Sequence, residues 1–477
     1  DGEWVVDAIL GADRSSNQVF FSGFMDTPLE KHLYQQAITH YQYDTCPECA
    51  NLRLVDGPPP TRITALGKSW LITMAPDGKS FIGTSSSPDQ PPQTGLYLID
   101  GVNALTIELE PGLISEALPI QEIAAQIISS FYGLSAQPVK GTENSIRINA
   151  FSAEVMEVFK AGLEEVTLYS EETGRIQLSE VSNVHFEPVR SEAKLIAWIE
   201  ENKLDESHPY APYLEDHTVP EYGTLTAEDG QTLYYSIQLP PNFDPSKKYP
   251  ALVEVYGGPH VQVVTRNWER LSDQFYSREG YIVFRLDNRG SANRGKKFED
   301  VIYRQMGIPE VRDQLVGVEW LKSQPFVDAD RIGIQGWSYG GYMTLMTILQ
   351  APEGTFAAAV AGAPVTDWHL YDTFYTERYM DTPQDNPDGY EKSSVFYHLD
   401  RLETELPNLM LVHGMADDNV TFDNTTRLMA ELQKKGIVFD LMTYPGQRHG
   451  IRGEALGIHL MKTRMAFLDR HLKASAE

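Results

Sequence analysis

The sequence lacks several features that would place it in common protein classes. No run of about 18 apolar residues occurs, which excludes a membrane-spanning helix. Positive charge is scarce, since 39 Lys and Arg residues stand against 67 Asp and Glu residues and give a formal net charge of −28. Because so acidic a surface repels phosphate backbones, we expect no nucleic-acid partner. Apolar residues make up 42% of the 477 residues, enough to build the cores of two or three domains.

Cysteine is nearly absent, with Cys46 and Cys49 as the only two. Their CxxC spacing is compatible with a redox site, half of a zinc site or a tight local disulfide. No second cysteine pair exists to complete a structural zinc site, and no thioredoxin-like βαβ pattern surrounds this one. We therefore favour a local disulfide, which predicts an oxidising location, either periplasmic or extracellular. We expect neither a metal nor another cofactor.

Residues 1–101 have the pattern of short strands separated by turns. The chain begins Asp1-Gly2-Glu3-Trp4, without an initiator Met or a signal-peptide pattern, and we interpret it as cut from a longer protein. Residues 75–79 predict a β-hairpin. This spacing is typical of a β-propeller or a sandwich, and about 100 residues would supply only two propeller blades. The predicted strands are Trp4–Val6, Val19–Gly23, His32–Tyr34, Trp70–Thr73, Ser80–Thr84 and Gly95–Ile99.

Residues 102–193 predict a small α+β module that is strongly acidic, with 14 acidic and 5 basic residues. Apolar residues recur at helical spacing over 120–131 and 155–159, and 145–148 and 166–178 are strand-like. We find no chemistry-bearing constellation there and expect its lone His185 to be structural. Residues 194–222 would complete the propeller-like part and form a proline-rich linker.

From residue 223 to 477, strands alternate with helices, which is typical of an α/β domain. Four near-continuous apolar stretches suit a parallel sheet that is buried on both faces, namely 251–256, 281–286, 332–335 and 409–412. Helices are predicted near 310–323, 341–350, 423–435 and 456–472.

The chemistry-bearing motif is Gly336-Trp337-Ser338-Tyr339-Gly340-Gly341, which lies between a predicted strand and a predicted helix. This G-x-S-x-G context is the nucleophile elbow of α/β-hydrolases, in which the serine is followed along the chain by an acid and then a histidine. Asp417 and Asp418 follow a strand end, and His449 lies before the last helix. Spacing alone does not separate the two aspartates. A competing histidine, His413, lies at the strand end and is interpreted as structural.

Acyl transfer also needs donors for an oxyanion. The peptide N–H of Tyr339 is one candidate, and the loop after residue 255 offers the hydroxyl of Tyr256 as another. Four aromatic residues crowd the segment 368–379, where they either pack in the core or form an apolar pocket that suits a proline ring. These residues are Trp368, Tyr371, Tyr375 and Tyr379.

Three stretches carry a resemblance to a known family: 336–342, the run Tyr-Thr-Glu-Arg-Tyr-Met over 375–380, and 413–420. Residues 220–477 resemble the prolyl oligopeptidase family of serine peptidases, most closely its dipeptidyl peptidase IV branch. The resemblance implies an α/β-hydrolase domain preceded by the last two blades of a β-propeller. Residues 102–193 interrupt this pattern, and we interpret them as an inserted module. The Cys46 and Cys49 pattern is also similar to a disulfide hairpin of this branch, which favours the disulfide interpretation.

The resemblance further implies residue roles. Ser338, Asp417 and His449 would form the triad, and Tyr256 and Tyr339 would bind the oxyanion. Asn419 would contact a substrate carbonyl. The pocket for the penultimate proline would consist of Tyr339, Val365, Trp368, Tyr371, Tyr375 and Val420.

The expected activity is therefore release of X-Pro, and less well X-Ala, dipeptides from peptide amino termini. The alternatives are a prolyl tripeptidyl or endopeptidase, an esterase, and an interaction protein on the same scaffold; a homodimer also stays open. Two departures from the family matter. The glutamate pair and arginine that grip the substrate's amino terminus have no counterpart here, so we expect weaker activity than that of a full-length relative. Residues 102–193 also have no counterpart that we recognise in the family.

Overall fold

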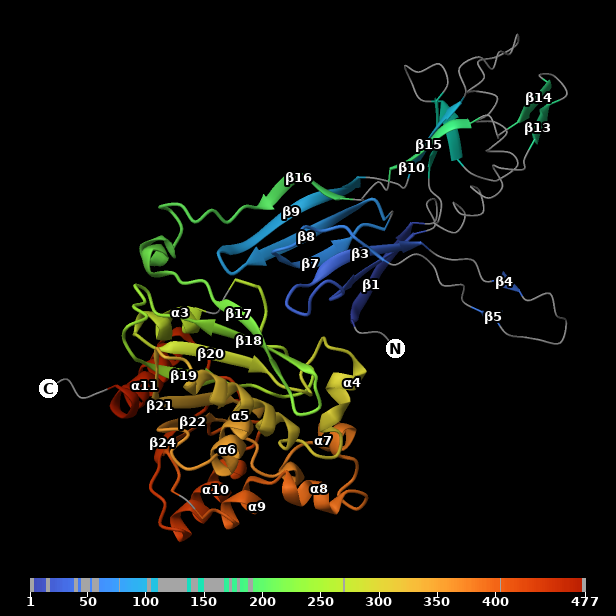
Figure 1. Ribbon diagram of the computed structural model, residues 1–477. Coiled ribbons are helices and arrows are strands. Elements are labelled where there is room, and N and C mark those ends of the chain that lie inside the picture. Colours follow the sequence, from blue (N-terminus) through green and yellow to red (C-terminus); the bar gives the residue numbers. More distant parts are fainter. Residues whose placement is uncertain are drawn as a thin grey trace. The chain divides into compact units, whose positions relative to one another are not determined.

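The computed structural model divides the chain into two compact units, Val6–Lys203 and Leu204–Glu477 with the first five residues (Figure 1). The residues that the structure describes are 4–13, 18–37, 42–43, 52–53, 60–76, 78–100, 104–109, 135–138, 145–149, 167–170, 174–177, 181–187, 192–268, 271–403 and 405–473.

The first unit consists of short strands, as the spacing of turns predicts. Its two larger antiparallel sheets have the strand orders β1-β2-β3-β6 and β16-β9-β8-β7. Four strands is the size of a propeller blade. The strands are β1 (Val6–Asp13), β2 (Gln18–Gly23), β3 (His32–Ala37), β4 (Gln42–Tyr43), β5 (Leu52–Arg53), β6 (Thr61–Arg62), β7 (Ser69–Met74), β8 (Ser80–Ser87), β9 (Gln90–Asp100), β10 (Ala104–Leu109), β11 (Ser135–Pro138), β12 (Ser145–Asn149), β13 (Thr167–Ser170), β14 (Gly174–Gln177), β15 (Val181–Glu187) and β16 (Glu192–Glu200).

Side chains that alternate along these strands build the core between the two sheets. Trp70 and Ile72 on β7 point inward, whereas Leu71 between them is 66% exposed. The rings of Phe81 and Tyr97 stack at 5.1 Å within the same cluster. The hairpin predicted over 75–79 joins β7 and β8, which pair antiparallel. One expected strand begins later than predicted: β1 starts at Val6, and Trp4 and Val5 precede it.

An insertion separates two strands that are neighbours in one sheet. β9 ends at residue 100 and pairs antiparallel with β16, which begins at residue 192. The intervening strands form a separate sheet of order β11-β12-β10-β15 and a hairpin of β13 and β14. The predicted strand over 145–148 and the hairpin within 166–178 are confirmed. The predicted helices over 120–131 and 155–159 lie outside the described residues.

The CxxC pair also lies outside the described residues. The disulfide between Cys46 and Cys49 and the periplasmic or extracellular location therefore remain predictions. His185 lies on β15 within the inserted sheet.

The second unit is built on an eight-stranded sheet of order β17-β18-β20-β19-β21-β22-β23-β24. In this order the strands from β20 onward pair parallel with one another, whereas β17 pairs antiparallel with β18 and β18 pairs antiparallel with β20. The strands are β17 (Glu221–Thr226), β18 (Thr232–Gln238), β19 (Tyr249–Glu254), β20 (Ile282–Asp287), β21 (Val327–Trp337), β22 (Ala358–Gly362), β23 (Asn408–Gly414) and β24 (Asp440–Tyr444).

Helices cover both faces of this sheet. The helical segments are η2 (Ala211–Asp216), α3 (Leu271–Arg278), α4 (Lys296–Glu299), η3 (Asp300–Ile302), α5 (Pro309–Lys322), α6 (Tyr339–Gln350), η4 (Trp368–Leu370), α7 (Thr373–Met380), α8 (Pro387–Lys392), α9 (Val395–Asp400), α10 (Asp423–Lys434) and α11 (Glu454–Leu472). The four predicted apolar strands and the four predicted helices are all present, as β19, β20, β21 and β23 and as α5, α6, α10 and α11.

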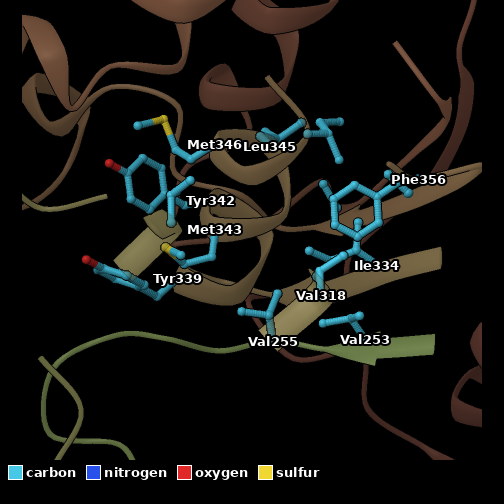
Figure 2. Packing of buried hydrophobic residues seen from close by; sticks show 14 of the residues in the cluster. Val253, Val255, Val318, Ile334, Tyr339, Tyr342, Met343, Leu345, Met346 and Phe356 are labelled. Atoms are coloured by element: carbon cyan, nitrogen blue, oxygen red, sulfur yellow. The ribbon is translucent and has the colours of Figure 1, made fainter. Parts of the chain in front are cut away.

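The core of the second unit has two halves, one on each face of the sheet. Val253 and Ile334 pack with α5 and α6 on one face, where Figure 2 shows Met343 of α6 close to Val255. Leu252 packs on the other face with residues of α3 and α11 such as Tyr276 and Phe467. Burial on both faces explains why these strands have continuous apolar sequences.

Residues 205–222, expected to form a linker, belong to the second unit. Pro212 lies in the first turn of η2, a position where the missing N–H costs nothing. The rings of Tyr210 and His217 pack on Trp268, at centroid distances of 5.6 and 4.9 Å. Pro212 therefore begins a helical turn beside which the aromatic rings pack.

Candidate active site

The nucleophile elbow is the turn between β21 and α6. Ser338 joins them with φ 61° and ψ −120°, a conformation that non-glycine residues adopt only under local constraint. Its peptide N–H donates to the carbonyl oxygen of Gly362 at 2.9 Å, which ties the turn to the end of β22.

Glycines are needed around Ser338 because the backbone approaches so closely. A Cβ atom on Gly340 would lie less than 3.0 Å from the carbonyl oxygen of Val255, and one on Gly341 would be as close to that of Gly362. These neighbours are backbone atoms in adjacent strands and cannot give way. The sequence Gly-Trp-Ser-Tyr-Gly-Gly therefore forms the elbow that its strand-to-helix position predicts.

The structure separates the two candidate acids. Asp417 is buried, and its Oδ2 lies 2.8 Å from Nδ1 of His449. Its Oδ1 accepts hydrogen bonds from the peptide N–H groups of Asn419 and Val420, at 2.9 and 3.1 Å. Asp418 is exposed and forms an ion pair with Arg448 at 2.8 Å. Asp417 is therefore the aspartate that the fold directs towards His449.

His413 braces the acid loop. Its Nε2 lies 3.1 Å from Oδ2 of Asp417 and 2.9 Å from the carbonyl oxygen of Val420, two acceptors that require a proton on this nitrogen. Its Nδ1 then accepts from the Thr425 hydroxyl at 2.7 Å. Burial lowers the pKa of His413, so the ring is neutral. This arrangement agrees with the structural role expected for His413.

Three contacts hold the His449 loop against the rest of the site. The indole N–H of Trp337, the residue before Ser338, donates to the carbonyl oxygen of His449 at 2.7 Å. The peptide N–H of Ala416 donates to the carbonyl oxygen of Gln447 at 2.9 Å, and that of Met415 donates to Tyr444 at 3.0 Å. All these segments follow the carboxyl ends of parallel strands, which meet at one edge of the sheet.

Tyr256 follows β19, next to the elbow in the sheet order. Its ring lies 6.1 Å from that of Tyr339. Burial raises the pKa of Tyr256, which keeps its hydroxyl protonated and able to donate a hydrogen bond. Gly258 lets this loop pass against the Tyr339 ring, because a Cβ atom there would lie less than 3.0 Å from it.

The predicted pocket residues come together around Trp368. Its ring lies 5.5 Å from Tyr339, 5.9 Å from Tyr371 and 6.2 Å from Tyr375. Val365 and Val420 are buried in the same apolar cluster, against which Tyr371 and Tyr375 pack. The aromatic residues of 368–375 therefore gather beside the residue that follows Ser338.

Asn419 is held by the same aromatic group. Its Oδ1 accepts a hydrogen bond from the Tyr371 hydroxyl at 2.8 Å, and its peptide N–H donates to Asp417. The bond to Oδ1 leaves the Nδ2 amino group as the donor end of the side chain. This orientation suits the expected contact with a substrate carbonyl.

The sequence did not indicate one buried residue that touches the site. Glu310, in the first turn of α5, accepts a hydrogen bond from the Tyr339 hydroxyl at 2.7 Å and is 0% exposed. Burial raises the pKa of Glu310 to about 7 and outweighs the opposing hydrogen bonds from the Gly307 peptide and Tyr339. An acidic residue in a first helical turn usually interacts with the helix dipole in solvent, so the sequence carries no signal of this contact.

Across the described residues, no group of three or more His, Cys, Asp or Glu side chains is placed to hold a metal ion. None of the helices in this part of the chain has the length and apolar character needed to cross a membrane.

Two family models match the chain. Residues 268–475 match the prolyl oligopeptidase family, and residues 1–92 match the N-terminal region of dipeptidyl peptidase IV. Dipeptidyl peptidase 8 of Mus musculus is 40% identical over 303 residues, which cover 62% of this chain and 33% of that protein. Dipeptidyl peptidase 8 of Homo sapiens is 42% identical over 275 residues, which cover 56% of this chain and 30% of that protein.

Among solved structures, Porphyromonas gingivalis dipeptidyl peptidase 4 aligns with a TM-score of 0.66 and 26% identity, over 99% of this chain and 50% of that chain. The chain thus spans about a third of these curated relatives and half of this solved structure. The expected architecture, an α/β-hydrolase domain preceded by part of a β-propeller, is confirmed. These matches support the expected resemblance to the dipeptidyl peptidase IV branch of the prolyl oligopeptidase family.

Proposed function

We propose that this chain is a serine exopeptidase that releases Xaa-Pro and, less well, Xaa-Ala dipeptides from peptide amino termini. The observation that carries the proposal is the hydrogen bond between Asp417 and His449, on a loop that Trp337 ties to the elbow of Ser338. A serine hydroxyl needs such an oriented base to become a nucleophile at neutral pH.

In the proposed reaction, the Ser338 oxygen attacks the scissile carbonyl carbon while Nε2 of His449 takes its proton. Asp417 holds the Nδ1–H and stabilises the imidazolium that forms. The peptide N–H of Tyr339 and the hydroxyl of Tyr256 bind the negative oxygen of the tetrahedral intermediate. The intermediate collapses, and His449 gives its proton to the leaving amine. Water then hydrolyses the acyl-enzyme with His449 again acting as the base.

The specificity for proline would come from the aromatic group around Trp368. A pyrrolidine ring is compact and apolar, and it would be bound between the rings of Tyr339, Tyr371 and Tyr375. An alanine side chain would reach fewer of these rings. One missing methylene in an apolar pocket costs about 1–3 kcal/mol, so X-Ala substrates would be cleaved more slowly.

The same chemistry also suits a prolyl tripeptidyl or endopeptidase. These activities differ in how the substrate's amino end is bound, and we assign no residue of this chain to that contact. The names of the relatives, dipeptidyl peptidases, favour the dipeptidyl activity.

The test compares an Xaa-Pro p-nitroanilide with its N-acetylated form. We expect the free-amine substrate to be turned over faster than the acetylated one, and turnover to fall in Ser338→Ala by several orders of magnitude. Equal cleavage of the acetylated substrate would favour an endopeptidase. A fluorophosphonate probe that fails to label the wild-type protein would overturn the serine hydrolase assignment and favour an interaction protein.

A further inference from the structure

Glu310 is a buried carboxyl group that the proposed reaction does not use. Its side chain is 0% exposed, and Oε1 accepts the Tyr339 hydroxyl at 2.7 Å. Its Oε2 has no hydrogen-bond partner among the described residues. Burying a carboxyl group with so few partners costs free energy, so its position beside Tyr339 calls for a functional explanation.

Tyr339 links this carboxyl group to the site in two ways. It is the residue after Ser338, so its peptide N–H faces the expected oxyanion. Its ring lies 5.5 Å from that of Trp368, which is assigned to the proline pocket, and 5.3 Å from that of Tyr342. Figure 2 shows the hydroxyls of Tyr339 and Tyr342 directed away from Val253 and Ile334, so the Tyr339 ring is not fixed at its hydroxyl end by the sheet.

We propose that Glu310 is a positioning residue for the proline pocket, acting through the Tyr339 hydroxyl. The inference rests on the proposed function. The hydrogen bond fixes the far end of the Tyr339 ring and therefore the wall that a pyrrolidine ring would contact. Without an acceptor, the buried hydroxyl must move to find another partner, and the ring moves with it.

The inference predicts a selective effect rather than a general one. A displaced Tyr339 ring would disturb a bound proline, which fills the pocket, more than a bound alanine, which offers a single methyl group. General destabilisation would instead lower the amount of active enzyme and affect both substrates equally. The ratio of kcat/KM for Xaa-Pro over Xaa-Ala therefore separates positioning from stability.

The experiment uses the variants Glu310→Leu, Glu310→Gln, Tyr339→Phe and the double variant Glu310→Leu with Tyr339→Phe. Glu319→Leu is the matched control, because Glu319 lies on the same helix with its side chain 65% exposed. Each protein is normalised by titration with a fluorophosphonate, and its thermal unfolding is recorded.

We expect Glu310→Leu to lower the Pro/Ala ratio by about 5- to 30-fold, the range that loss of one ordered hydrogen bond gives. Glu310→Gln, which keeps an acceptor oxygen, should restore most of the ratio. The double variant should match Tyr339→Phe, because Glu310 has no target once the hydroxyl is gone. Glu319→Leu should leave the ratio unchanged.

An unchanged ratio in Glu310→Leu, with a normal titration, would overturn the inference while leaving the proposed function intact. A further fall in the ratio from Tyr339→Phe to the double variant would also overturn it, since Glu310 would then act by another route. If the wild-type protein is labelled by the probe but cleaves neither substrate, the proposed function fails instead.

Discussion

Replacing Asp417 by Asn is the most informative test of the candidate triad, because the structure gives each oxygen of this carboxylate a separate task. Oδ1 accepts the peptide N–H groups of Asn419 and Val420, and Oδ2 faces Nδ1 of His449 and Nε2 of His413. An asparagine that keeps its oxygen towards the two peptide groups must place its amino group against the two histidine rings. The N–H groups of the two histidine rings would then face the amino group of the asparagine, and donors cannot hydrogen-bond to one another.

The two histidines would respond differently. His413 keeps its proton on Nε2, because the carbonyl oxygen of Val420 still accepts it at 2.9 Å. Among the described residues, His449 Nδ1 has no acceptor other than Asp417, so in the variant its proton moves to Nε2 and Nδ1 accepts from the asparagine. The nitrogen that must take the serine proton is then already protonated. A base held in the wrong tautomer costs about 10⁴-fold in kcat.

The matched control is Asp418→Asn. Asp418 and its partner Arg448 are 60% and 74% exposed, and such surface pairs contribute about 0–1 kcal/mol. We expect kcat to change less than about 3-fold in this variant, since its charge is screened by water. The assay is hydrolysis of an Xaa-Pro p-nitroanilide by probe-titrated enzyme, with circular dichroism to confirm folding. Activity of Asp417→Asn within 10-fold of wild type, or an equal loss in Asp418→Asn, would refute the reasoning.

Three further predictions concern stability, each measured by urea unfolding followed through tryptophan fluorescence. Gly340→Ala should lower the free energy of unfolding by about 1–3 kcal/mol or more, because the added Cβ would overlap the carbonyl oxygen of Val255. Gly457→Ala in α11 has open space around it and should instead raise the free energy of unfolding by about 0.5–1 kcal/mol. Asp273→Ala should cost about 3–5 kcal/mol, because it leaves the buried Arg285 without its bidentate partner at 2.7 and 2.9 Å. Burial raises the pKa of Glu310 from 4.5 to about 7, so between these pH values the native state holds a proton that the unfolded chain releases. Stability should therefore fall as the pH rises from about 4.5 to about 7, and Glu310→Gln should make that fall less steep. Stability that rises over the same pH range equally in wild type and variant would contradict the last prediction.

The parts of the site that sequence predicts well are local. The motif Gly-Trp-Ser-Tyr-Gly-Gly is recognisable because its surroundings admit few other residues: glycines 340 and 341 lie against backbone atoms, and an apolar strand precedes the serine. The strand β22 was not predicted, although it lies in the interior of the sheet. Four of its five residues, Ala358–Gly362, are Ala or Gly and only Val360 favours a strand, so pairing with β21 and β23 determines their conformation.

Two kinds of residue are harder to assign from sequence: neighbours with the same side chain, and residues whose contacts are far away along the chain. Asp417 and Asp418 have the same chemistry and neighbouring positions, and only the turn of the loop directs one inward to two peptide N–H groups and the other to Arg448. Four aromatic residues over 368–379 were equally compatible with core packing and with a pocket. The structure places the ring of Trp368 5.5 Å from that of Tyr339 on α6, and Tyr371 and Tyr375 pack against Trp368 in turn.

The same reasoning explains why Glu310 gave no signal. Its contact with Tyr339 joins the first turns of α5 and α6, which are brought together because both helices cover one face of the sheet. A sequence motif identifies the reacting residue. The residues that position it lie on other helices and strands, and the order of strands in the sheet determines which of these are adjacent. In this chain the sheet order β19-β21-β22-β23-β24 brings Tyr256, Ser338, Asp417 and His449 to one edge. Positioning residues such as His413 and Glu310 are therefore best sought among buried polar side chains that contact the residues at this edge.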